Sequence, residues 1–254
     1  MSELIFTQGL TKNFSGLVAV NQVNFHIEKD QVTGLIGPNG SGKTTLFNLL
    51  SGYFPPTEGT ITFEGRDLTM TPPHKRVAMG MARTFQLVSV FDSLSVWENL
   101  VLSNLAFRKK DRSVVKFYLK SSKRPDVLDE CRKLLAVVGL EAKAGSVTAE
   151  LSYGDKRRLE IAIALSLKPK LLLLDEPLSG LSDHEIGEII ELLHRFKQEL
   201  TLVIIEHKIS KIVDLVERLS VMNDGYIICE GDPEDVLSDP RVRECYWGKE
   251  KGIC

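Results

Sequence analysis

Paired cysteines, excess charge and long apolar runs are all lacking in this sequence, and each shortage excludes a class of protein. The four cysteines are scattered without a CxxC pair, in a chain of 254 residues that can fold without disulfides. We therefore expect reduced thiols. The formal net charge of −2 gives no general basic field for nucleic acid or an anionic membrane, so no nucleic-acid partner is expected.

Membrane-directed segments are lacking as well. No apolar run reaches the roughly 18 residues of a spanning helix. The N-terminal stretch MSELIFTQGLTKNF has no basic region followed by an apolar one. These absences predict a cytoplasmic protein, peripheral to a membrane at most. The stretch 107–124 holds eight Lys or Arg and one Asp, which predicts a solvated connector, with a contact to lipid head groups or a partner as the alternative.

Two kinds of apolar pattern are present. Alternating apolar and polar residues over 4–30 and again over 59–65 predict half-buried antiparallel strands in an N-terminal β layer. Continuous apolar runs predict strands covered on both faces of a parallel sheet. These runs are VTGLI (32–36), KLLLLD (170–175) and LTLVIIE (200–206). Near the end of the chain, LSVMNDGYIICEG predicts a hairpin about Asp224-Gly225.

Helical patterns separate these strands. They follow Lys43 and cover 95–107, 126–140 and 184–200. Glycines such as Gly52 and Gly139 end several of them, as helix C-caps do. The order of elements predicts one α/β domain over 1–254. Its core comprises 1–71 and 169–254, and a mainly α-helical subdomain is inserted at 72–168.

A phosphate-binding motif follows the first apolar run. GPNGSGKTT (37–45) satisfies GxxxxGK[ST] between a predicted strand and a predicted helix, which is the context that the motif requires. Gly37, Gly40 and Gly42 can adopt backbone angles that aim successive N–H groups into one concavity, and the helix start adds a positive dipole end. A merely glycine-rich turn is the alternative. The motif predicts a binding site for the phosphates of a nucleotide.

Side chains of the motif also contribute to this phosphate-binding site. Lys43 is expected to reach the β- and γ-phosphates, and the hydroxyl of Thr44 to bind Mg²⁺. Thr45 is expected to add a hydrogen bond to the phosphate chain. The other residues of the motif that we assign to nucleotide binding are Pro38, Asn39 and Ser41.

Two carboxylates end the second apolar run, in LLLLDEP (171–177). The carboxyl ends of strands in an open α/β sheet share one edge, so Asp175 should lie beside the phosphate loop. There Asp175 can hold Mg²⁺, through water, and Glu176 can orient and polarise an attacking water. A helix N-cap is the alternative for either acid. Together with the phosphate loop, the pair predicts nucleotide hydrolysis.

With these motifs in place, the chain resembles the ATPase subunits of ABC transporters over nearly its whole length. GPNGSGKTT resembles the Walker A motif, LLLLDEP the Walker B motif, and LSYGD (151–155) the signature usually written LSGGQ. The resemblance implies the P-loop NTPase fold of an ABC ATPase, with a mixed, largely parallel sheet as its core, an N-terminal antiparallel β subdomain and an inserted α-helical subdomain. It also implies ATP and Mg²⁺ as cofactors.

The resemblance extends to single residues outside these motifs. Gln86 in RTFQ falls at the Q-loop glutamine, a Mg²⁺ ligand that also senses the transport partner, and His207 in IIEH at the switch histidine that contacts the γ-phosphate. Phe14 in KNFSGL matches the aromatic that stacks on adenine, with Val20 packing nearby. Taken singly, Gln86 could be a surface amide, Phe14 a core aromatic, and His207 the cap of a helix starting near Ile209.

The signature has both a local and an intermolecular interpretation. Ser152 and Asp155 fit a capping box at a helix start. The resemblance further implies that Ser152 and Gly154 face the γ-phosphate of ATP held by a second ATPase subunit, identical or different, in a head-to-tail dimer. Two positions depart from the family pattern. Tyr153 and Asp155 replace Gly and Gln of the usual signature, and Ser182 stands where many members carry the D-loop aspartate.

Longer stretches narrow the resemblance further. RTFQLVSVFDSLSVWENL, LSYGDKRRLEIA and the tail DPRVRECYWG are similar to the branched-chain amino acid importer ATPases. This implies integral-membrane permease subunits as partners, and membrane contact only through them, on the cytoplasmic face. The alternatives are a urea importer, a lipopolysaccharide-extraction transporter, a soluble iron–sulfur-assembly ATPase and a nucleotide-binding module without turnover. Because both Glu176 and His207 are present, the sequence favours a hydrolytically competent subunit.

Overall fold

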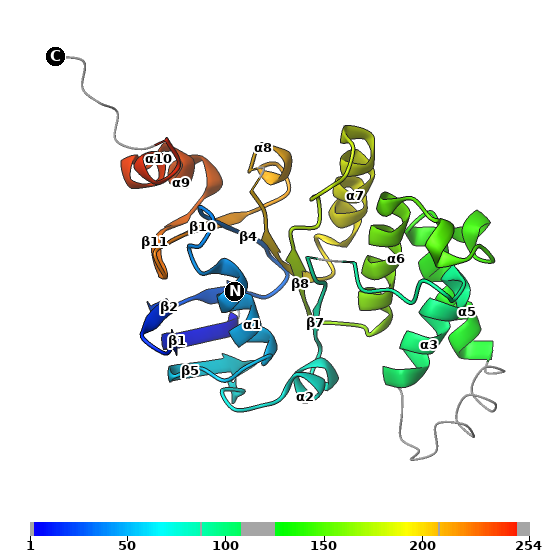
Figure 1. Cartoon of the computed structure of the whole chain (residues 1–254), viewed down its shortest axis with the longest axis horizontal. Coiled ribbons are helices and arrows are strands. Elements are labelled where there is room, and N and C mark those ends of the chain that lie inside the picture. Colours follow the sequence, from blue (N-terminus) through cyan, green and yellow to red (C-terminus); the bar gives the residue numbers. More distant parts are fainter. Residues whose placement is uncertain (1–2, 87, 108–124, 208, 248–254) are drawn as a thin grey trace.

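The computed structural model describes residues 3–86, 88–107, 125–207 and 209–247, which form two sheets with helices around them (Figure 1). Apart from Phe107, the basic stretch predicted as a connector lies outside the described residues. Within the described part of the chain, no helix is both long enough and apolar enough to cross a bilayer.

The first sheet is antiparallel and is built from N-terminal residues. Its strands run in the order β2-β1-β5-β6, and β3 also pairs with β1. The strands are β1 (Glu3–Phe14), β2 (Leu17–Val23), β3 (His26–Glu28), β5 (Glu58–Phe63) and β6 (Arg66–Asp67). The antiparallel strands predicted over 4–30 and 59–65 are confirmed, and β6 is a further strand that the alternation did not predict.

The second sheet has six strands in the order β11-β10-β4-β9-β8-β7. All neighbours are parallel except the terminal pair β10 and β11, which form the predicted hairpin. The strands are β4 (Val32–Ile36), β7 (Met81–Arg83), β8 (Leu171–Asp175), β9 (Thr201–Ile205), β10 (Arg218–Asn223) and β11 (Tyr226–Gly231). At the hairpin turn Asp224 and Gly225 have φ of +46° and +84°, the backbone that a tight two-residue turn requires.

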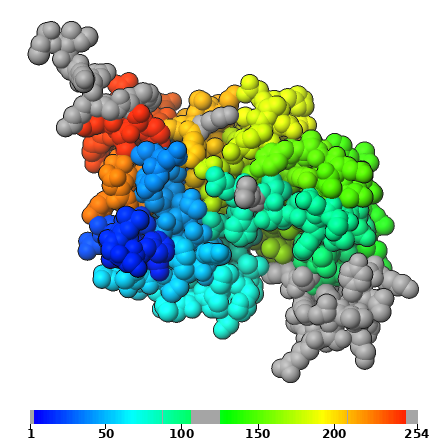
Figure 2. Space-filling view, in the orientation of Figure 1, coloured from blue at the N-terminus to red at the C-terminus, as the bar shows by residue number. Residues whose placement is uncertain are grey.

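Helices cover both faces of this second sheet or extend beyond it. They are α1 (Lys43–Ser51), α2 (Pro73–Ala78), α3 (Val96–Phe107), α5 (Pro125–Val137), α6 (Tyr153–Ser166), α7 (Asp183–Phe196), α8 (Ile209–Ile212), α9 (Pro233–Ser238) and α10 (Pro240–Trp247). In the space-filling view the green surface of the inserted helices and the red surface of α9 and α10 lie at opposite ends of the molecule (Figure 2). The helix predicted over 184–200 is shorter than expected, because α7 ends at Phe196.

Two apolar clusters bury the central strands from opposite sides, as the continuous apolar runs predict. One cluster joins the first sheet and α1 to one face of the second sheet. Its central-strand members are Leu35, Leu171, Leu173, Val203 and Ile205. The other cluster joins α3, α5, α6 and α7 to the opposite face, through Val32, Leu172, Leu174, Leu202 and Ile204. This packing fixes the carboxyl ends of β4, β8 and β9 along one edge.

Strand β7 lies in the stretch 72–168 that the sequence assigned to a mainly helical subdomain. Its three residues pair in parallel with β8 at the edge of the second sheet. So short a strand carries no periodic signal in the sequence. The helix α2 precedes β7 in this stretch, and the helices α3, α5 and α6 follow it.

Candidate nucleotide site

The loop from Gly37 to Gly42 leaves β4 and leads directly into α1. Gly37, Gly40 and Gly42 have φ of +153°, +81° and +104°, which favour glycine at each position. At two of these positions, steric clashes exclude any residue with a Cβ. A Cβ on Gly37 would lie 2.0 Å from the carbonyl oxygen of Met222, and one on Gly42 would lie 2.3 Å from that of Ala19. The loop therefore packs closely against its neighbours while its backbone makes a tight turn.

Lys43 folds its ammonium group back over this loop. Its Nζ donates to the carbonyl oxygens of Gly37 (2.8 Å) and Pro38 (2.9 Å) and to Ser41 Oγ (3.3 Å). Burial lowers the pKa of Lys43, and the negative charges of Glu176 and Asp175 oppose this effect. These carboxylates therefore lie close enough to act on the ammonium group, as the shared sheet edge predicts.

The remaining loop residues differ in exposure. Asn39 and Thr44 are exposed, and Pro38 and Thr45 are half-buried. At the start of α1 no acidic side chain occupies the first turn, and no side chain caps the helix. The free N–H groups and the positive end of the helix dipole thus remain for an anion.

The three residues predicted to act in hydrolysis come together although they are far apart in the sequence. Glu176 Oε2 accepts a hydrogen bond from Gln86 Nε2 at 3.2 Å, and Glu176 Oε1 lies 2.9 Å from His207 Nε2. Glu176 itself has φ of +49°. A left-handed backbone costs a non-glycine residue about 1–3 kcal/mol, and such strain clusters at functional sites.

Asp175 ends β8 and is nearly inaccessible to solvent. Its Oδ2 accepts a hydrogen bond from Arg83 Nη2 at 2.8 Å, whereas Oδ1 is buried and has no hydrogen-bond partner among the described residues. Burial raises the pKa of Asp175, and the hydrogen bond and charge of Arg83 oppose that rise. A buried carboxylate oxygen without a partner is destabilising by about 1–3 kcal/mol or more. Asp175 Oδ1 is therefore a suitable ligand for a hard cation such as Mg²⁺, or for a water bound to one.

Of the two residues predicted near the adenine, only Phe14 is exposed. Phe14 is 43% exposed, and its ring packs edge-on against Phe54, with 5.4 Å between the ring centroids. Lys12 Nζ lies 5.2 Å from the centroid of the Phe14 ring. Val20, in contrast, is fully buried in the core cluster. In this structure Val20 offers no surface to a base, because the strand that carries it turns its side chain inward.

The signature begins α6, and Ser152 caps it by accepting a hydrogen bond from the N–H of Asp155 at 3.1 Å. The second half of the predicted capping box is wrong. The Asp155 carboxylate instead forms ion pairs with Lys143 and Arg158. An aspartate is one methylene shorter than the glutamate that usually completes this motif, and two cations lie within its reach.

A carboxylate from another helix accepts a hydrogen bond from the backbone of the signature. Glu185 of α7 accepts a hydrogen bond from the N–H of Gly154 at 3.2 Å, and the same oxygen lies 3.5 Å from Ser152 Oγ. A Cβ on Gly154 would lie 2.4 Å from this oxygen. The other oxygen of Glu185 completes a full capping box with Ser182. An anion thus already occupies this helix start in the single chain.

A buried ion pair between two residues of the signature helix α6 holds the backbone next to Gln86, and the sequence interpretation missed it. Arg157 Nη1 pairs with Glu160 Oε2 at 2.7 Å. Arg157 also donates to the carbonyl oxygens of Phe85 (2.9 Å) and Gln86 (3.0 Å), and Glu160 accepts from the N–H of Phe85 at 3.1 Å. The signal available was the i, i+3 pair of opposite charges in RRLEIA, on a helix that is otherwise largely buried.

We expect Glu160→Gln to lower the free energy of unfolding by about 3–5 kcal/mol, because the Arg157 charge then stays buried without its carboxylate. Urea denaturation followed by circular dichroism measures this loss. Glu191→Gln is the matched control, because Glu191 pairs with Arg195 on the exposed face of α7. Its effect should be much smaller. Equal losses in the two variants would contradict the assignment of the cost to burial.

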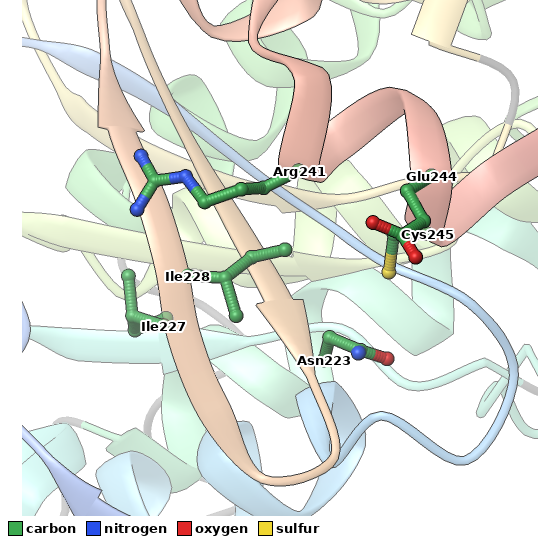
Figure 3. Close-up of a pocket in the computed structure, with 6 residues that line it drawn as sticks. All are labelled: Asn223, Ile227, Ile228, Arg241, Glu244 and Cys245. Carbon is green, nitrogen blue, oxygen red and sulfur yellow. The ribbon is translucent and has the colours of Figure 1, made fainter. Parts of the chain in front are cut away.

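A cavity of about 650 Å³ lies between the β10–β11 hairpin and α10 (Figure 3). It is lined by Asn223, Ile227, Ile228, Arg241, Glu244 and Cys245. In the close-up Arg241 extends across the two strands (Figure 3). Its guanidinium is already paired with Asp239 at 2.7 Å. None of the predicted nucleotide residues lines this cavity.

A phosphate loop after β4 and an acidic pair after β8, along one edge of a largely parallel sheet, define a P-loop nucleotide-binding protein. Residues 20–179 match the family described as "ABC transporter", and residues 227–250 match "Branched-chain amino acid ATP-binding cassette transporter". The chain belongs to the ABC transporter family. It is an ATP-binding subunit of that family, an ABC ATPase, as the resemblance implied.

Individual relatives cover nearly the whole chain. The high-affinity branched-chain amino acid transport ATP-binding protein LivG of Salmonella typhimurium is 36% identical over 250 residues, which are 97% of this chain and 98% of that protein. The lipopolysaccharide export system ATP-binding protein LptB of Acidithiobacillus ferridurans is 33% identical over 98% of each chain. The crystal structure of a nucleotide-free ATP-binding cassette from an ABC transporter matches with a TM-score of 0.86 and 31% identity. That match covers 98% of this chain and 100% of the other.

Proposed function

We propose that this chain hydrolyses ATP to drive the import of branched-chain amino acids through integral-membrane permease subunits. One observation carries the hydrolytic part: Glu176 is held between Gln86 and His207 beside the phosphate loop. Two similarities support the substrate, namely 36% identity to LivG along the chain and the match of residues 227–250 to the branched-chain family. The lipopolysaccharide alternative has the similarity to LptB, at 33% identity over 98% of this chain.

Binding of ATP follows from the loop and its surroundings. The backbone N–H groups of residues 39–42 and of the start of α1 donate hydrogen bonds to the phosphates, with Lys43 turning from its loop carbonyls towards the β- and γ-phosphates. Phe14 stacks on the adenine, since it is the exposed aromatic at the end of β1. Thr45 adds a hydrogen bond. The oxygens of Thr44, Asp175 and Gln86 suit Mg²⁺, which when bound neutralises charge on the β- and γ-phosphates.

Hydrolysis needs a group that takes up the proton of the attacking water. Glu176 has that role, because its carboxylate lies at the site with both oxygens already hydrogen-bonded to polar side chains. His207 contacts the γ-phosphate, and its hydrogen bond to Glu176 keeps the carboxylate oriented. Gln86 lies on the other side of the same carboxylate and links it to the backbone held by the signature helix.

A second ATPase subunit completes the site. Ser152 and Gly154 lie at a helix start where the N–H of Gly154 donates a hydrogen bond to an anionic group, which in this single chain is the Glu185 carboxylate. In the dimer the γ-phosphate bound by the opposite subunit takes that place. The chain lies on the cytoplasmic face of the membrane and contacts the bilayer only through the permeases.

Depletion of the protein in its own cells tests the transport assignment. Uptake of radiolabelled leucine, isoleucine and valine should fall to background, and the wild-type gene should restore it while the Glu176→Gln variant does not. Urea uptake and surface lipopolysaccharide should be unchanged. Normal amino acid uptake combined with loss of either of those two functions would replace our proposal with that alternative.

A further inference from the structure

Arg83 is the last residue of β7, three residues before Gln86, and its guanidinium reaches two other elements. Nη2 donates to Asp175 Oδ2 at the end of β8, at 2.8 Å. Nη1 donates to Asn48 Oδ1 at 2.7 Å and to Ser51 Oγ at 3.0 Å, and both acceptors lie on α1. One cation therefore joins the strand that leads into Gln86, the strand that carries the acidic pair and the helix that follows the phosphate loop.

Burial fixes this arrangement. The Arg83 side chain is 7% exposed and that of Asp175 is 2% exposed. The guanidinium lies 5.6 Å from the centroid of the Phe47 ring and 5.2 Å from that of Phe85, within reach of cation–π attraction. Moving it away would leave the Asp175 carboxylate buried without its cation, which is strongly destabilising. The planar guanidinium group also fixes the direction of each hydrogen bond, which a lysine ammonium does not.

The two oxygens of Asp175 are thereby made different. Arg83 occupies Oδ2, while Oδ1 is buried and has no hydrogen-bond partner among the described residues. We propose that Arg83 is a positioning residue, which holds Asp175 in the rotamer that presents Oδ1 to the divalent cation of the bound nucleotide. This inference rests on the proposed function. It adds a residue that the predicted site did not include and that acts only through Asp175.

Groups that hydrogen-bond a metal ligand and fix its orientation change metal affinity by roughly 10- to 100-fold when they are removed. We therefore expect the Kd for Mn²⁺ to rise by roughly that factor in both Arg83→Lys and Arg83→Met. The measurement is electron paramagnetic resonance of Mn²⁺ titrated into the full chain saturated with a non-hydrolysable ATP analogue. The affinity for the same analogue in EDTA should stay within about threefold of that of the parent chain, because Arg83 does not reach the phosphate-binding loop.

The lysine variant separates positioning from charge alone. It keeps a cation beside Asp175 but cannot bond Asp175, Asn48 and Ser51 together. Parental Mn²⁺ affinity in Arg83→Lys would overturn the proposal, and so would an equal loss of analogue binding in EDTA, which would indicate a merely structural role. Arg132→Met is the matched control, because Arg132 is an exposed arginine paired with Asp129, and it should leave both affinities unchanged.

Asn48→Ala keeps the test decisive if the Arg83 variants fold poorly. It removes one acceptor of Nη1 and leaves the Arg83–Asp175 pair in place, so a smaller rise in the Kd for Mn²⁺ is expected. No rise in this variant would contradict the inference. If the proposed function is itself wrong, the result is different: the parent chain binds neither the analogue nor Mn²⁺.

Discussion

Replacing Glu176 with glutamine is expected to reduce ATP turnover by roughly 10²- to 10⁴-fold, the usual contribution of a positioned proton acceptor. Binding of ATP should be retained, because glutamine has nearly the same size and can still hydrogen-bond Gln86 and His207. Without hydrolysis the ATP-bound dimer should accumulate. Phosphate release measures the first effect, equilibrium binding of a fluorescent ATP analogue the second, and size-exclusion chromatography with ATP the third.

The matched control for this variant is Glu64→Gln. Glu64 also has a positive φ, of +50°, and its carboxylate pairs with Lys170 at a half-exposed position. The same chemical change there should leave turnover at the parental rate. If Glu176→Gln itself turned over at that rate, the assignment of the proton acceptor would be wrong, whatever the dimer does.

The parts of the fold that the sequence predicted well are those whose burial is encoded locally. The run VTGLI matches β4 from end to end, and KLLLLD and LTLVIIE match β8 and β9 to within one residue at each end. A strand covered on both faces is apolar along most of its length, so its pattern can be recognised without knowledge of its neighbours. The same holds for the loop after β4, where glycine is required by the backbone itself.

Polar contacts between distant residues could not be predicted in this way. Arg83 and Asp175 are 92 positions apart, and Arg157 and the carbonyl of Gln86 are 71 apart. Periodicity says which face of an element is apolar, but not which charge of another element lies opposite it. Even the local capping pattern was ambiguous: Ser-x-x-Asp at Ser152 forms only the cap, whereas Ser-x-x-Glu at Ser182 forms the complete box.

Replacing Lys43 with alanine is expected to weaken ATP binding by roughly 10- to 100-fold. Hydrogen bonds to charged groups contribute about 1.5–3 kcal/mol, and about 1.4 kcal/mol corresponds to a tenfold change in Kd. The ammonium is already partly desolvated, because burial lowers its pKa, and it is held over the loop by three oxygen acceptors. A phosphate oxygen can replace those neutral acceptors with a charged one in the same low-dielectric surroundings, where the attraction is stronger than in water.

Isothermal titration calorimetry with the non-hydrolysable analogue measures this loss, and Lys170→Ala is its control. Lys170 is a half-exposed lysine paired with Glu64, so removing its charge should not alter the affinity. Unchanged affinity for the analogue in Lys43→Ala would contradict the assignment of the loop as the phosphate-binding site. The expected result is a loss of ATP binding confined to Lys43→Ala, with turnover still reduced in Glu176→Gln at saturating ATP. This would separate the residue that binds the phosphates from the residue that activates the water, as the geometry around β4 and β8 requires.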